Sequence, residues 1–109
     1  MILLLVLFLL SSALLSGLSV PMILGKIPPN GLYGFRVKKT MENLEIWYPV
    51  NAYSGKWLLV VGSIMALASV GLFIVPGISL DTYTYSILAV WGVVFAVALL
   101  ASFRYMNSL

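Results

Sequence analysis

The side chains that could carry out chemistry are few in this 109-residue chain. The absence of Cys and His removes the thiol nucleophile, the commonest general base and the commonest zinc ligand. The acids are Glu42, Glu45 and Asp81. Glu42 and Glu45 could touch one cation from a shared helix, but two carboxylates without another hard ligand make a poor metal site. We therefore expect no enzyme activity, no metal and no cofactor.

The basic side chains are gathered rather than spread. Three of the six lie in the stretch "YGFRVKKT", residues 33–40, and six cations are too few for a nucleic-acid-binding face. Arg36 has two interpretations. It is either a topology determinant that reaches lipid phosphates, as Lys38 and Lys39 would, or a structural or binding guanidinium with five donors in a fixed fork.

The rest of the chain must position these charged residues, and its composition indicates that it lies in a lipid bilayer. It is 62% hydrophobic and only 8% charged, with a mean hydropathy of +1.12, more apolar surface than a small soluble domain can bury. Three apolar runs predict spans, at residues 2–24, 57–75 and 83–103. The first run reaches roughly 35 Å as a helix, enough to cross the hydrocarbon core. We expect an all-α protein with one membrane domain of three transmembrane helices.

The first run could instead be a cleaved signal peptide. It has no basic segment before it, is long for such a signal, and shows no A-x-A-like cleavage site. We therefore predict a permanent helix.

The loops predict the orientation in the cell membrane. Five cations flank the connection 25–55: Lys26, Arg36, Lys38, Lys39 and Lys56. The second connection, 76–82, has one acid and no cation, and Arg104 follows the third run. The positive-inside rule then places the loop 25–55 and the C-terminus in the cytoplasm, and the N-terminus outside.

Small residues four positions apart occur in every span and can bring helices close together. The pairs are Ser12/Ser16, Ala13/Gly17, Gly62/Ala66 and Gly92/Ala96. They predict seams inside the three-helix bundle, and leave a homo-oligomer or a membrane partner protein open.

The cytoplasmic loop should begin with an irregular turn and continue as an amphipathic helix at the membrane surface. Thr40 is the expected N-cap of that helix, and Pro49 the expected site of a kink or break. One side of it would carry Met41, Leu44, Trp47, Tyr48, Asn51 and Gly55. Asn51 would need partners there, from the loop backbone or from Arg36.

The order of residues in this loop resembles the signature of the SdpI family of small prokaryotic membrane proteins. The signature is an Asn, Gly-x-Arg, a Thr four residues after the Arg, then Trp, Asn and Gly at four-residue steps. The matching residues are Asn30, Gly34, Arg36, Thr40, Trp47, Asn51 and Gly55. The chain departs from the pattern at Val37-Lys38, where members often carry Thr-Pro, and at Pro49, where they carry a polar residue.

The resemblance implies a membrane-embedded immunity or sensor role, because the family's namesake protects a bacterium from its own secreted peptide toxin and holds a repressor at the membrane. The seven matching residues would then bind a partner or structure the loop. The alternative is a small accessory or scaffold subunit of a larger membrane complex or transporter. A small multidrug transporter is disfavoured, because no carboxylate lies inside a span.

Overall fold

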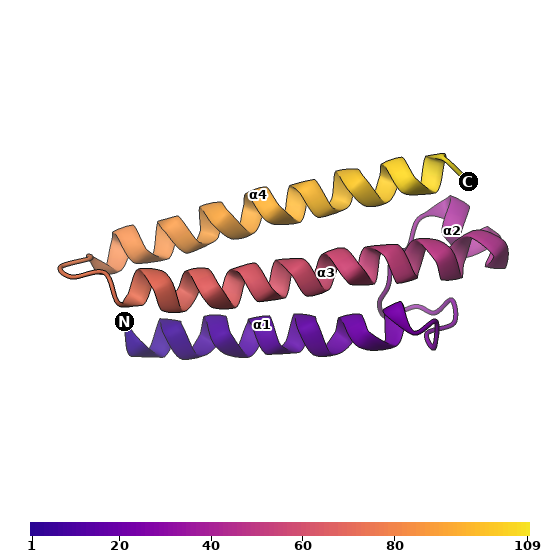
Figure 1. Cartoon of the computed structure of the whole chain (residues 1–109). Coiled ribbons are helices and arrows are strands. Elements are labelled where there is room, and N and C mark those ends of the chain that lie inside the picture. Colours follow the sequence, from indigo (N-terminus) through magenta and orange to yellow (C-terminus); the bar gives the residue numbers. More distant parts are fainter.

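The computed structural model describes residues 1–109 and contains four α-helices: α1 (Ile2–Ile23), α2 (Lys38–Glu42), α3 (Leu44–Phe73) and α4 (Leu80–Asn107). The three long helices lie side by side and alternate in direction, with α3 in the middle (Figure 1). All three are long and apolar enough to cross a membrane, which confirms the predicted all-helical, multi-pass protein. Helices α1 and α4 each pack against α3 and scarcely meet one another.

Helix α1 ends in a glycine turn that releases the chain into the loop. Gly25 adopts a φ of +69°, its N–H donates to the Met22 carbonyl, and the Lys26 N–H donates to the Pro21 carbonyl. These two bonds are the Schellman arrangement, which satisfies carbonyl groups that the helix itself leaves free. The loop therefore leaves α1 at a defined angle.

Small residues set the spacing of α1 and α3. A Cβ added at Gly62 would lie 3.0 Å from the Ser12 carbonyl oxygen and still closer to the Ser16 hydroxyl. Gly55 and Gly62 are seven residues apart, the period that keeps two helices in contact along a shallow crossing. Of the predicted seams, Ser12/Ser16 and Gly62 therefore lie inside the molecule.

The other two small-residue pairs face outward. Ala13 and Gly17 are exposed on α1, and Gly92 and Ala96 are exposed on α4. A Cβ added at Gly17 or Gly92 would meet nothing within 4 Å. The predicted seam inside the bundle is therefore wrong for these two pairs, and the alternative of a contact with another chain stays a prediction for them.

Polar contacts join α4 to α3 across the hydrocarbon region. The Tyr83 hydroxyl donates to the Ser69 carbonyl at 2.9 Å, and the Ser54 hydroxyl donates to the Ser102 hydroxyl at the same distance. Tyr83 and Ser69 are both fully buried. Because lipid offers no competing partners, such bonds help to hold the two helices together.

The second long helix begins earlier than the hydropathy predicts. Helix α3 runs without a break from Leu44 to Phe73, so residues 44–55 are its first turns and not part of a loop. Of the kink or break expected at Pro49, the break is absent. Proline removes one backbone donor here, the bond to Glu45, and contacts on both sides of it hold the helix together.

The expected amphipathic segment is also not what connects the first two spans. Met41 is 40% exposed and Leu44 62% exposed, whereas Trp47 and Asn51 are buried. The connection between α1 and α3 is instead an irregular chain followed by the five-residue helix α2. One apolar side therefore does not extend through 41–55, because α2 and α3 are separate helices joined at Asn43.

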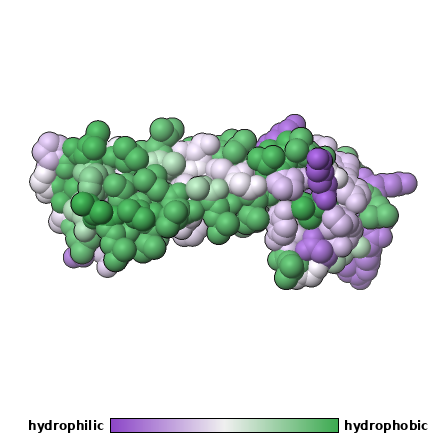
Figure 2. Space-filling view, turned by 90° about the horizontal axis from the view of Figure 1, so that it is seen from below, coloured by the Kyte–Doolittle hydropathy of each residue, from purple (hydrophilic) through white to green (hydrophobic).

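The surface divides along the length of the molecule. Hydrophobic side chains cover most of the length, and the strongest hydrophilic patches gather at the end that carries α2 (Figure 2). The C-terminus lies at that end, and the N-terminus lies at the other, with the α3–α4 connection (Figure 1). The loop and the end of α4 are thus brought together.

Candidate functional site

The loop between α1 and α3 is the part of the chain with the densest polar contacts. It begins with a turn that Asn30 holds from within. The Asn30 Oδ1 accepts from the N–H groups of Leu32 and Tyr33 at 2.8 and 2.9 Å, and its Nδ2 donates to the Pro28 carbonyl at 2.8 Å. An asparagine side chain that bonds the backbone two residues on is a common means of fixing a turn.

Trp47 and Asn51 lie one turn apart on α3 and attach the loop to that helix. The Trp47 Nε1 donates to the Ile27 carbonyl at 2.7 Å. The Asn51 Oδ1 accepts from the Phe35 N–H at 2.6 Å, and its Nδ2 donates to the Trp47 carbonyl at 2.9 Å. Both side chains are buried, so these bonds replace water that cannot reach them.

Gly34 provides the space in which this attachment forms. Its φ is +122°, and a Cβ at this position would lie 2.8 Å from the Asn51 Oδ1 and 3.1 Å from the Trp47 ring. The backbone thus passes directly over both side chains in a conformation that residues with a side chain rarely adopt. Only glycine satisfies the two conditions together.

Thr40 is buried beneath the same segment and does not have its expected role. The N-cap of α2 is Val37, and Thr40 is the third residue of the helix. Its Oγ1 accepts from the Val37 N–H at 3.0 Å and donates to the Phe35 carbonyl at 2.8 Å. The hydroxyl therefore reaches back to close the helix start, as the side chain at this position does in a capping box. The N-cap prediction was wrong by three residues.

Gly55 lies on α3 one turn after Asn51, where α3 contacts the end of α1. A Cβ there would lie 3.0 Å from Met22, from Ile23 and from the Ser19 carbonyl oxygen. The position brings the end of α1, and hence the start of the loop, against α3. It adjoins the attachment of the loop without being part of it.

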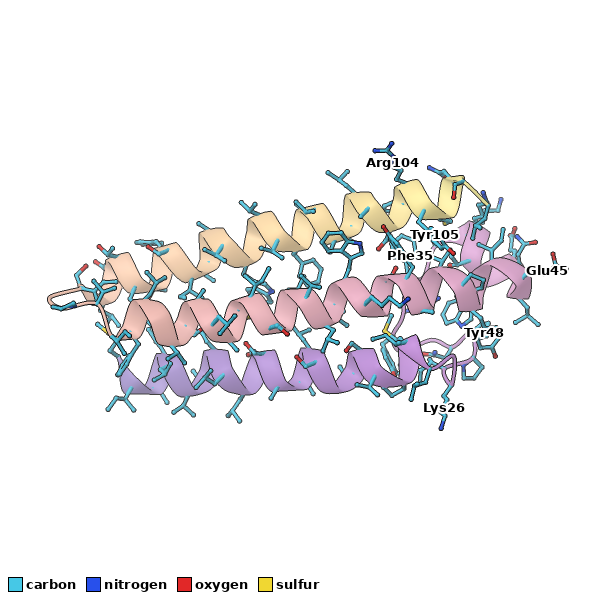
Figure 3. The ribbon with its side chains drawn as sticks, in the orientation of Figure 1. Lys26, Phe35, Glu45, Tyr48, Arg104 and Tyr105 are labelled. Atoms are coloured by element: carbon cyan, nitrogen blue, oxygen red, sulfur yellow. The ribbon has the colours of Figure 1, made fainter.

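We call Gly34, Phe35, Thr40, Trp47 and Asn51 the loop clamp. Phe35, which the sequence analysis did not single out, links its other members through its backbone N–H and carbonyl. Its ring packs with Val50 and Met106 in a small core, and lies beside Tyr105 between α3 and α4 (Figure 3). The one sequence signal for it was an aromatic residue between Gly34 and Arg36.

Lys39 does not have the role predicted for it, that of reaching lipid phosphates. Its Nζ donates to the Met106 carbonyl at 3.3 Å, near the end of α4. A cation at the C-terminal end of a helix is favourable, because the last carbonyl groups carry partial negative charge. The loop is therefore attached to α4 as well as to α3.

Arg36 lies outside the loop clamp. Its side chain is exposed, as is that of Lys38, and the partners of Asn51 come from the backbone. Among the seven residues of the sequence pattern, Asn30, Gly34, Thr40, Trp47, Asn51 and Gly55 all shape the loop or its junction with the helices. Arg36 is the member that the arrangement leaves facing outward.

The inner side of the loop covers an apolar hollow of about 290 Å³ between the three long helices. Tyr33, Gly34 and Phe35 line it from the loop, together with Met22 of α1 and Phe95 of α4. Since α1 and α4 scarcely touch, the loop bridges the gap between them at this end of the molecule.

The chain matches the model of a known protein family. The model of the SdpI/YfhL protein family matches residues 26–103, which include all seven pattern residues, α3 and most of α4. No curated protein and no solved structure shows significant similarity to the chain.

Proposed function

The chain belongs to the SdpI/YfhL protein family, and on that premise we propose that it is a non-enzymatic immunity or sensor protein of the cell membrane. It acts through the loop between α1 and α3. The ligand is a membrane-active peptide toxin or a regulatory protein that offers acidic groups to this loop.

One observation carries the proposal: the loop clamp fixes the backbone of residues 34–40 while Arg36 remains exposed on it. A surface that is ordered before binding loses less conformational freedom when a partner arrives. A guanidinium held in this way can form two parallel hydrogen bonds to a carboxylate or a phosphate. Arg36 is then the contact residue, and the clamp residues are positioning residues.

The proposed orientation places the loop in the cytoplasm. Lys26, Arg36, Lys38 and Lys39 all lie in the connection between α1 and α3, whereas the connection between α3 and α4 contains no cation. The positive-inside rule favours the cationic end on the cytoplasmic side. The N-terminus is then outside and the C-terminus inside.

The test compares Arg36→Gln with Lys26→Gln in a sensitive bacterial host that expresses the full chain. Lys26 is exposed at the same end of the molecule, so the control removes an equal charge outside the clamp (Figure 3). The measurement is survival when the host is challenged with membrane-active peptides secreted by the source organism. We expect protection by the wild type and by Lys26→Gln, and its loss in Arg36→Gln at equal membrane abundance.

Trp47→Phe and Asn51→Ala complete the series, because each removes a bond that holds the loop. Both should reduce protection. If all three loop variants protect as well as the wild type, the loop is not the functional surface. If the wild type protects against no secreted fraction, the immunity role itself is contradicted.

The accessory-subunit alternative is favoured by a different observation, the two exposed small-residue pairs Ala13/Gly17 and Gly92/Ala96. Such stripes let a second helix approach closely in lipid. Extraction from the native membrane in mild detergent should then recover a stoichiometric partner, and Gly92→Ile should release it. Recovery of the chain alone, or only with copies of itself, would count against this role.

A further inference from the structure

A groove opens on the outer side of α3 and α4, away from the hollow beneath the loop. The open groove has a volume of about 620 Å³. Its lining residues are Tyr53, Val97, Leu100, Ala101, Arg104, Tyr105 and Ser108. All but Tyr53 come from the last turns of α4, so the groove follows that helix to its end.

The groove is apolar along its length and polar at one end. Val97, Leu100 and Ala101 form the apolar part, and Arg104 and Ser108 follow toward the C-terminus. From Val97 to Ser108 the helix rises about 16 Å at 1.5 Å per residue. Tyr53 and Tyr105 stack beside it with ring centroids 4.3 Å apart and an interplanar angle of 11°. An apolar strip that ends beside a cation suits the upper part of an acyl chain and an anionic headgroup.

The Arg104 guanidinium at the polar end of the groove has no anionic partner in the protein. Arg104 is exposed, and no carboxylate is among the groove residues. Its side chain points away from the helices at the end of the molecule that carries the loop (Figure 3). A guanidinium at the boundary of the hydrocarbon region finds its anionic partners among lipid phosphates.

We propose that this groove binds one phospholipid with an anionic headgroup from the adjoining leaflet. The phosphate lies against the Arg104 guanidinium, whose fork suits two of its oxygens. The upper part of one acyl chain lies along Val97, Leu100 and Ala101. The proposal is independent of the role of the loop, because none of these residues belongs to the loop clamp.

A structural role for Arg104 is the competing explanation. The residue lies in the last turn of α4, where a cation stabilises the helix without any ligand. That role predicts a loss of helix stability in Arg104→Gln with no change in lipid retention. The two explanations therefore differ in what a lipid-binding measurement shows.

The experiment titrates the purified full chain in mild detergent with phosphatidylglycerol, and separately with phosphatidylcholine, and counts bound lipids by native mass spectrometry. The wild type should retain one phosphatidylglycerol in preference to phosphatidylcholine. Arg104→Gln should weaken that retention about tenfold, since it removes a charge-assisted bidentate contact. Lys26→Gln, which removes a charge on the opposite side of the same end, should leave it unchanged (Figure 3).

Two further variants test the apolar part with the charge intact. Ala101→Phe fills the groove near its polar end, and Val97→Trp fills the far end; each should also weaken retention. Equal weakening by Arg104→Gln and Lys26→Gln would indicate diffuse attraction and overturn the proposal. Full retention by both groove-filling variants, or displacement of the lipid by inorganic phosphate, would overturn it as well.

Discussion

At the scale of single residues, Asn51 is the group that joins the loop to the membrane helices. Its amide uses a donor and an acceptor at once, toward the Trp47 carbonyl and the Phe35 N–H. Leu would leave the buried Phe35 N–H without a partner, at a cost of about 1–3 kcal/mol. An ionised Asp could accept from that N–H but has no donor for the Trp47 carbonyl. The amide can occupy this position because Gly34, whose backbone passes over it, has no side chain.

Gly34→Ala should therefore release the loop. The added methyl group would lie 2.8 Å from the Asn51 Oδ1, and the φ of +122° is strained for alanine. We expect a loss of about 1–3 kcal/mol in the free energy of loop opening. The rate of limited trypsin cleavage after Arg36, Lys38 and Lys39 measures that opening and should rise.

Gly31→Ala is the matched control, since a Cβ there would meet nothing within 4 Å and the residue lies in the same loop. Trypsin should cleave this variant at the wild-type rate. A variant at Gly34 that is cleaved no faster than Gly31→Ala would show that the clamp does not limit access to the loop.

The spacing of Trp47, Asn51 and Gly55 at four-residue steps predicts from sequence that they share one face of a helix. The loop backbone was one of the two predicted sources of partners for Asn51, and it supplies the Phe35 N–H. Which backbone groups Trp47 and Asn51 would meet could not be predicted, because the Ile27 carbonyl and the Phe35 N–H belong to irregular backbone whose path follows no periodicity. For the same reason Thr40 was interpreted as an N-cap. The residue type favours a helix start, but the Oγ1 reaches the start from within the first turn.

At the scale of helices, α3 organises the molecule because α1 and α4 both pack on it. Hydropathy alone predicted the three spans, since each is a predominantly apolar run with no ionisable side chain except Tyr. It could not predict that α3 starts at Leu44, because the first turns of the helix are polar on one side and contain Pro49. Tertiary contacts from the loop hold those turns in helical form, and such contacts override local preference.

Gly62→Ala should loosen the contact of α1 with α3. Its methyl group would lie 3.0 Å from the Ser12 carbonyl, a backbone atom that can move only if the helices separate. We expect the free energy of unfolding in mixed micelles to fall by about 1–3 kcal/mol.

Gly17→Ala separates this effect from helix propensity. The residue is exposed in the middle of α1, and its added Cβ would meet nothing within 4 Å. Alanine there should be neutral or stabilising by up to about 1 kcal/mol. Equal unfolding free energies for the two variants would mean that Gly62 does not determine the distance between the helices.

At the scale of the whole molecule, the cationic residues are concentrated at one end, and both proposed functions depend on that end. The connection between α1 and α3 and the end of α4 carry cations, and the connection between α3 and α4 carries none. The fold brings these cationic segments to one end although they are far apart in sequence (Figures 1 and 2). Both proposed binding surfaces, Arg36 on the loop and Arg104 beside the groove, lie at that end.

This asymmetry predicts the orientation in the cell membrane. A reporter fused after Leu109 should be active only as a cytoplasmic protein, and one inserted between α3 and α4 only as an external protein. Replacing Arg36, Lys38 and Lys39 together by Gln should raise the fraction of chains inserted the other way, because those charges supply much of the bias. An external C-terminal reporter in the wild type would place the loop outside. Arg36 would then face partners outside the cell, and the lipid of the groove would come from the outer leaflet.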